Sequence, residues 1–181
     1  SHPQFEILEE DLQFMARSNF LGFYWEGSTD FAANHLNYYL LAKLLWNPER
    51  PAEEILEDHY RSAYGPAADA VRAYYELLES SFAARQPADG IYMGNTPSWY
   101  TPETLARAAR LLDEAEAAAG GDSGRRERLA YLRFGHRYTE MALRFTRLCR
   151  QLGDNGMPVR MQQYVPQPVA EPASPRQMRA W

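Results

Sequence analysis

Apolar residues recur every three or four positions along most of the chain, which is the spacing of one face of an α-helix. The first such pattern begins at Phe5 and predicts a helix that ends near Asn19. The next residues, Phe20–Trp25, are almost all apolar and predict one short β-strand. A helix is expected from Asp30 to Trp46. It is apolar almost all round from Leu36 onward, so we expect it to be buried.

Glycine and proline residues divide the following part of the chain into further helices. Gly65 suits a left-handed helix end and Pro66 suits the first turn of a new helix. Thr101 is a good N-cap, and a loop is expected over residues 86–100. The expected helices run from Pro51 to Gly65, from Pro66 to Phe82, from Thr101 to Gly120 and from Arg125 to Leu152.

The last of these helices has the most regular pattern in the chain. Its large apolar residues alternate three and four apart, which predicts a packing seam against another helix rather than a cofactor site. The members of this seam are Tyr131, Phe134, Tyr138, Met141, Phe145, Leu148 and Leu152. After Gly153 the chain becomes rich in proline and polar residues, which predicts a linker or disorder.

The predicted strand raises a structural problem, because a single strand cannot pair its backbone N–H and C=O groups. The only other strand-like stretch is the short run Ile91–Met93. Either Phe20–Trp25 is not a strand, or its partner strands lie outside this sequence. A strand between two helices is typical of α/β folds, in which the carboxyl ends of the strands carry the chemistry.

Charge and composition exclude several classes of function. The formal net charge is −5 and the pI is near 5.4, which argues against binding to a nucleic-acid backbone. No apolar run reaches the length of a membrane span. Cys149 is the only cysteine, so neither an internal disulfide nor a Cys-rich metal site is expected. No cofactor-binding motif is present, and we expect neither a cofactor nor a metal site.

The start of the chain has two possible origins. Residues 1–6 match the core of a streptavidin-binding affinity tag, without the Trp and Lys that flank that tag. Phe5 also fits the helical pattern that follows, so native sequence is the other possibility. The chain begins without Met, and we expect that an earlier part of the protein is missing.

The candidate site lies around the turn that follows the predicted strand. Glu26 would project at the strand end, where a carboxylate can act as acid, base or nucleophile in glycosidic cleavage. Tyr24 and Trp25 offer aromatic faces for the apolar face of a sugar ring. Asp30 and His35 lie close by in sequence and could bind substrate.

Each of these residues also has a structural interpretation. Trp25 can be a core aromatic, Glu26 an exposed acid in a turn, and Asp30 a favourable charge in the first turn of a helix. His35 follows Phe31 by one helical turn, and histidines in such positions are commonly satisfied within the fold.

Four segments in order resemble the C-terminal part of large bacterial glycoside-hydrolase-like proteins, many of which are assigned only to a domain of unknown function. These proteins are similar to α-glucuronidases and β-hexosaminidase-type barrels. The resemblance extends from about Leu8 to Leu152. The segments are Gly22–Phe31, Leu36–Pro48, Tyr64–Ala68 and Tyr74–Leu78.

The resemblance implies a mainly α fold, in which a helical C-terminal region is preceded by the last βα piece of a TIM-type barrel. Residues 1–29 would be that piece, 30–152 a region of about five helices, and 153–181 the disordered tail. It also implies carbohydrate as substrate and the rest of the barrel as partner, with no nucleic acid and no membrane involved. Glu26 would be the catalytic carboxylate, and its partner carboxylate would lie on an absent strand, so the chain alone would be inactive. The alternatives are a non-catalytic helical interaction module and an independent helical bundle.

Overall fold

The computed structural model describes residues 3–22, 24, 31–84, 100–154, 159–162 and 165–168. The fold is mainly helical, as predicted. The elements are α1 (Phe5–Arg17), α2 (Phe31–Trp46), α3 (Ala52–Tyr64), the 3₁₀ helix η1 (Gly65–Ala67), α4 (Ala68–Ala83), α5 (Pro102–Ala118), α6 (Ser123–Asp154), β1 (Val159–Gln162) and β2 (Val165–Pro168).

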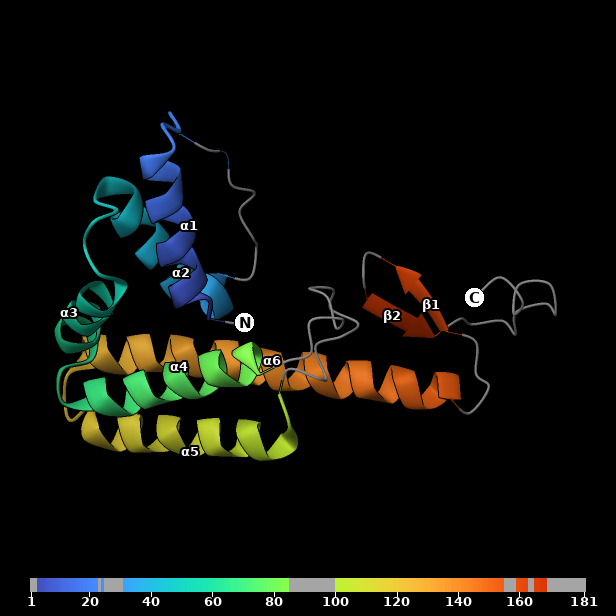
Figure 1. Ribbon diagram of the computed structural model, residues 1–181. Coiled ribbons are helices and arrows are strands. Elements are labelled where there is room, and N and C mark those ends of the chain that lie inside the picture. The colour runs from blue at the N-terminus through green and yellow to red at the C-terminus, as the bar shows by residue number, and fades with distance from the viewer. Residues whose placement is uncertain are drawn as a thin grey trace.

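The helices form two groups that share one core. α4, α5 and α6 run alongside one another, and α1 and α2 lie across this layer, with α3 at one end (Figure 1). α2 packs on α6 and α1 packs on α2. The C-terminal part of α6 extends beyond the ends of α4 and α5 (Figure 1).

Several helix ends follow directly from local sequence, as predicted. Gly65, at φ 52°, ends α3 in a conformation that favours glycine. Gly120, at φ 65°, follows α5. The Oγ1 atom of Thr101 accepts a hydrogen bond of 3.1 Å from the amide of Thr104, and Pro102 occupies the first helical turn.

The core is made by one apolar face from each helix. α1 contributes Phe5, Leu8 and Leu12, which are all buried. α4 contributes one buried stripe at helical spacing, made of Val71, Tyr74, Tyr75, Leu78 and Phe82. Because helices of this length are marginal on their own, their stability comes mainly from this shared burial.

The strand predicted over residues 20–25 is not present in the described residues of that segment. Residues 20–22 and 24 have no strand structure, and Trp25 lies outside the described residues. The barrel piece implied by the resemblance is therefore not shown. The short run Ile91–Met93 also lies outside the described residues.

The structure differs from expectation in the proline-rich tail. β1 and β2 pair antiparallel, with Val159 opposite Pro168 and Gln162 opposite Val165, and both strands contact α6. These segments fall in the stretch for which the sequence predicts a linker or disorder. Strands of four residues each are weakly encoded in sequence, which explains why the pattern missed them.

The prediction that the seam of α6 packs against another helix of the chain is wrong. Phe134 and Met141 are 63% and 65% exposed, and the other seam residues from Tyr131 to Leu148 are also exposed. The buried face of α6 is a different one, which carries Leu132 and Leu143. The buried face also carries His136, Thr139 and Thr146, whereas the predicted seam consists of large apolar residues, so apolar periodicity selects the seam rather than the face that meets the core.

The described helices show no candidate for a membrane span, because none combines the length and the apolar character required.

We predict that Gly135→Ala destabilises the fold. A Cβ atom at Gly135 in α6 would lie 2.5 Å from the carbonyl oxygen of Ala32 in α2, so the two helix backbones must separate. The expected loss in free energy of unfolding is roughly 1–3 kcal/mol, measured by urea unfolding.

Gly124→Ala is the matched control on the same helix. Its Cβ would meet only side-chain atoms at 3.5 Å or more, and alanine favours the helix by about 0.5–1 kcal/mol. Equal stability of the Gly135→Ala variant and the unmodified protein would contradict the close packing of α2 on α6.

Candidate functional site

The predicted site residues lie between the end of α1 and the first turns of α2, and the structure describes two of them. Trp25, Glu26 and Asp30 lie outside the described residues, so the roles predicted for them stay predictions. Tyr24 is 90% exposed. His35 lies on α2 and is half-buried. Tyr24 is therefore open to a ligand, whereas His35 is partly covered by the rest of the chain.

The surroundings of His35 favour a role within the fold. Its Nε2 atom lies 3.4 Å from the hydroxyl oxygen of Tyr75, and its ring centroid lies 6.1 Å from that of Tyr131. Burial lowers the pKa of His35, although a hydrogen bond with the backbone of Ala32 acts in the opposite direction. The imidazole is thus neutral near pH 7. Direct contact between His35 and a sugar stays a prediction.

The chain leaves α1 through a left-handed residue that directs it outward. Asn19 has φ 57°, and the amide of Phe20 donates a 3.3 Å hydrogen bond to the carbonyl oxygen of Met15. This is the bond that closes a Schellman motif, and asparagine tolerates the required conformation. Beyond Phe20, residues 21, 22 and 24 make no backbone–backbone hydrogen bond with any other described residue. The side chain of Leu21 is fully exposed.

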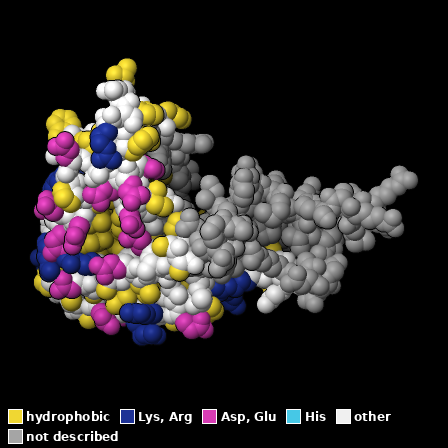
Figure 2. Space-filling model, in the orientation of Figure 1, with side chains coloured by type: hydrophobic (Ala, Val, Ile, Leu, Met, Phe, Trp, Pro, Cys, Tyr) yellow, Lys and Arg dark blue, Asp and Glu magenta, His cyan; other side chains and the backbone are white. Residues whose placement is uncertain are grey.

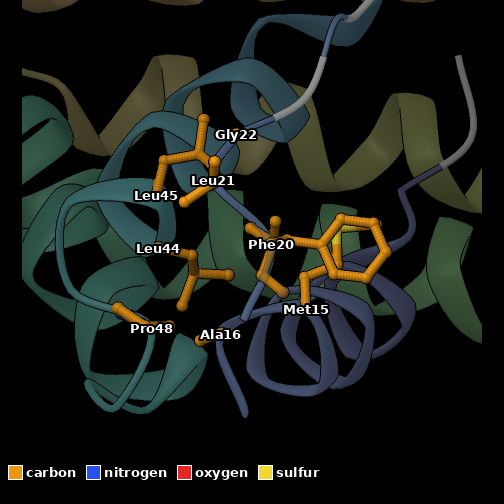
Figure 3. A pocket seen from close by; sticks show the side chains of 9 residues that line it. Met15, Ala16, Phe20, Leu21, Gly22, Leu44, Leu45 and Pro48 are labelled. Atoms are coloured by element: carbon orange, nitrogen blue, oxygen red, sulfur yellow. The ribbon is translucent and has the colours of Figure 1, made fainter. Parts of the chain in front are cut away.

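An apolar groove lies where this segment passes the ends of α1 and α2. Its volume is about 180 Å³. Figure 3 shows Met15 and Phe20 on one side of it and Leu44 and Leu45 on the other. None of the side chains that line the groove carries a charge, so it can hold an apolar group but cannot transfer a proton. It is lined by Leu12, Met15, Ala16, Phe20, Leu21, Gly22, Leu44, Leu45 and Pro48.

Exposed apolar side chains continue this groove along the C-terminal end of α2. Leu45 is half-exposed and Trp46 is 91% exposed. The prediction that α2 is buried almost all round from Leu36 is therefore wrong at its last turn. Trp46 was missed as a candidate binding residue, although a tryptophan followed by Asn47-Pro48 at a helix end was a usable signal.

A second groove, of about 270 Å³, lies between α1, α3 and α4 and is acidic. Acidic side chains gather around an apolar surface on this face of the molecule (Figure 2). The glutamates that line it are Glu6, Glu9, Glu53, Glu57, Glu76 and Glu79. The ring of Tyr60 and the side chain of Leu56 contribute apolar surface.

Two of these carboxylates cap helices that belong to other parts of the chain. Oε1 of Glu79 in α4 accepts a hydrogen bond of 2.8 Å from the amide of Phe5, at the start of α1. Oε1 of Glu9 in α1 accepts one of 3.2 Å from the amide of Ala52, at the start of α3. Burial raises the pKa of Glu79, opposed by the bonds from the backbone amides. These acids hold helices together, and no local pattern in the sequence indicates such contacts.

The described residues do not assemble a metal site. Across the ranges that the structure describes, no group of three or more His, Cys, Asp or Glu side chains is placed to hold a metal ion. The glutamates of the acidic groove are engaged in part by helix amides and by Arg72, which pairs with Glu57.

We predict that Glu79→Ala lowers the free energy of unfolding by roughly 1–2 kcal/mol, because it removes the cap from α1. Urea unfolding followed by circular dichroism measures this. Glu76→Ala is the matched control, since Glu76 is exposed one turn earlier on α4 and caps no helix. An equal loss from both substitutions would show that overall charge, rather than capping, is responsible.

The free energy of unfolding is also expected to fall as the pH is lowered, because burial lowers the pKa of three histidines. Burial lowers the pKa of His59 to about 4, from an ordinary value of 6.5, and it lowers the pKa of His35 and His136 in the same direction. Above pH 6.5 both folded and unfolded His59 are neutral. Between pH 6.5 and about 4 only the unfolded state takes up the proton, so stability is lost as pH falls through this window.

His59→Gln should therefore flatten the dependence of unfolding free energy on pH within that window, as measured by urea unfolding at a series of pH values. Part of the slope should remain, because His35 and His136 contribute with the same sign. An unchanged slope would contradict a neutral, buried His59.

Comparison with known proteins bears on the N-terminal part of the chain. No curated protein and no solved structure matches the chain. A family model described as "Domain of unknown function (DUF4838)" matches residues 1–76. The matched residues include the end of α1, the predicted site segment and the apolar groove, so the part similar to this family is the part that carries the candidate site.

Proposed function

We propose that this chain is the helical part of a carbohydrate-active, glycoside-hydrolase-like protein, and that the segment after α1 contributes to its sugar-binding pocket. The observation that carries this proposal is the exposure of the segment. Phe20, Leu21 and Tyr24 are exposed immediately before Trp25 and Glu26 in the sequence. Large apolar side chains exposed together are typical of surfaces completed by a partner or a ligand.

In this proposal the aromatic residues and the carboxylate have separate roles. Tyr24 and Trp25 stack on the apolar face of a sugar ring, which an exposed phenol such as that of Tyr24 can reach without rearrangement of the core. Glu26 contacts the glycosidic oxygen or the anomeric carbon and acts as acid, base or nucleophile. Its partner carboxylate comes from the rest of the barrel, outside this sequence. Asp30 hydrogen-bonds sugar hydroxyls.

The apolar groove supports a further part of the proposal, namely that the helices of this chain pack on the barrel. The groove lies beside Phe20 and Leu21 and has no charged lining residue, so an apolar side chain from the barrel can enter it without burying an unpaired charge. The match of the family model to residues 1–76 supports treating the groove and the site segment as one functional region.

The second candidate function is a non-catalytic interaction module. The exposed apolar side chains of α6 favour it. In that case the site segment is part of a docking surface, and Glu26 has no role in bond cleavage.

We predict that Glu26→Gln in the full-length protein lowers turnover of aryl glycosides by at least about 100-fold, because a positioned proton donor or acceptor contributes roughly 10²–10⁴-fold. The melting temperature should not change, because a single charge in a connecting segment contributes little to packing. Turnover is measured with a panel of chromogenic glycosides that differ in sugar and linkage.

Glu10→Gln is the matched control, since Glu10 is an exposed carboxylate on α1 away from the site segment. It should leave turnover unchanged. If Glu26→Gln also leaves turnover unchanged, or if the full-length protein cleaves none of the glycosides, the catalytic proposal fails and the interaction module remains.

A further inference from the structure

The exposed apolar face of α6 forms a continuous surface, here called the α6 stripe. Its most exposed members are Phe134 and Met141, at 63% and 65%. The stripe consists of Tyr131, Phe134, Tyr138, Met141, Phe145 and Leu148. At 1.5 Å per residue it extends for about 26 Å along the helix. Tyrosine, phenylalanine and methionine are the residue types most enriched at protein interfaces.

The other sides of α6 are already occupied by helices of the same chain. Gly135 brings α6 against the backbone of α2 at Ala32. The ring of His136 lies 5.8 Å from that of Tyr74 in α4, centroid to centroid. Arg133 reaches α5, where it pairs with Asp113 at 2.6 Å. The stripe is the sector left between these neighbours, and its side chains stay exposed although β1 and β2 also contact α6.

The spacing of the stripe specifies the kind of element that covers it. Successive members are three and then four residues apart throughout, which is the seam of a left-handed coiled coil. A partner helix packs along such a seam at a shallow angle, whereas a strand or a small molecule would not match a repeat of this length.

Charges beside the stripe specify the partner further. Arg137 and Arg144 directly precede Tyr138 and Phe145, so both lie on the same flank. Both are exposed, and neither forms an ion pair with another residue in the described part of the chain. Flanking positions of this kind pair with opposite charges on the partner helix.

The opposite flank is lined by small side chains. Gly135 and Cys149 occupy the equivalent positions there and are buried within the chain, and Ala142 lies between them, so this flank offers no charge to a partner. A second copy of α6 is therefore a poor occupant. In an antiparallel pair Arg137 and Arg144 would face the same two arginines, and in a parallel pair they would face the small residues and find no carboxylate.

We propose that the α6 stripe is a docking surface for an amphipathic helix of another protein or domain, with apolar residues at heptad spacing and carboxylates beside them that pair with Arg137 and Arg144. The stripe excludes water through its aromatic residues, and the two guanidinium groups set the register and orientation of the incoming helix. The surface functions independently of the proposed sugar site.

The test uses the whole chain and two synthetic helical peptides of three heptads. Both carry leucine at the seam positions. One carries glutamate at the flanking positions and the other carries lysine, and binding is measured by fluorescence anisotropy. We expect the glutamate peptide to bind at least about tenfold more tightly than the lysine peptide. Glutamates attract Arg137 and Arg144, whereas lysines repel them. This preference should weaken as salt is raised.

Two double variants separate the contributions of charge and apolar surface. Arg137→Glu with Arg144→Glu should reverse the preference, so that the lysine peptide binds more tightly. Phe134→Ser with Met141→Ser should weaken both peptides without changing the melting temperature, because both side chains are exposed. Arg107→Glu with Arg110→Glu is the matched control, since these arginines are exposed on α5. It should leave the preference as it is.

Three outcomes would overturn the proposal. The first is equal binding, or no binding, of the two peptides. The second is concentration-dependent self-association in sedimentation velocity that Phe134→Ser with Met141→Ser abolishes, which would make a second copy the occupant. The third is binding to vesicles of anionic lipid that the same variant abolishes while neither peptide binds, which would assign the stripe to a membrane surface.

Discussion

The position of α1 depends on a carboxylate that belongs to another helix. The first amides of any helix have no partner within it, and the N-terminal end carries a partial positive charge. Neither Gln4 before α1 nor Pro51 before α3 supplies a side-chain cap. Glu79 from α4 caps α1 instead, and Glu9 from α1 caps α3. Each cap satisfies amides at a helix end and at the same time fixes one helix relative to another.

These caps link α4 to α1 and α1 to α3, and the pairing of Arg72 with Glu57 links α3 back to α4. The closed set of contacts determines where the C-terminal end of α1 points. Asn19 then turns the chain at the end of α1, and Leu21 and Tyr24 beyond it are exposed. The same contacts give three glutamates of the acidic groove, Glu9, Glu57 and Glu79, a structural role. The only carboxylate that we propose for chemistry, Glu26, lies in the segment beyond it.

Two apolar surfaces remain uncovered by the described residues, and they lie on different helices. The groove beside Phe20 and Leu45 adjoins the candidate site, whereas the α6 stripe is framed by α2 and α5 on either side. Together they indicate a protein whose surfaces are completed by contact with other protein. The positive charges of Arg137 and Arg144 give the stripe a preference for an acidic partner, which the uncharged groove does not have.

The sequence by itself determined the helices and many of their ends, because those depend on residues that are close in the chain. Gly65, Thr101 and Gly120 act through local conformation or local hydrogen bonds and could be interpreted without any partner. The candidate site could be located from sequence only as a segment. Of the two members that the structure describes, Tyr24 is exposed and His35 packs on Tyr75, a contact across 40 residues that no pattern indicates.

Tertiary structure alone decided which face of α6 is buried and which acids cap helices. The buried face of α6 combines Leu132 and Leu143 with polar residues such as Thr139, so periodicity selected the more apolar seam and could not show that the chain's own core uses the other face. The bond between Glu79 and the amide of Phe5 joins residues 74 positions apart. Such contacts depend on how whole helices meet, because side chains distant in sequence are brought together only by the packing of the elements that carry them.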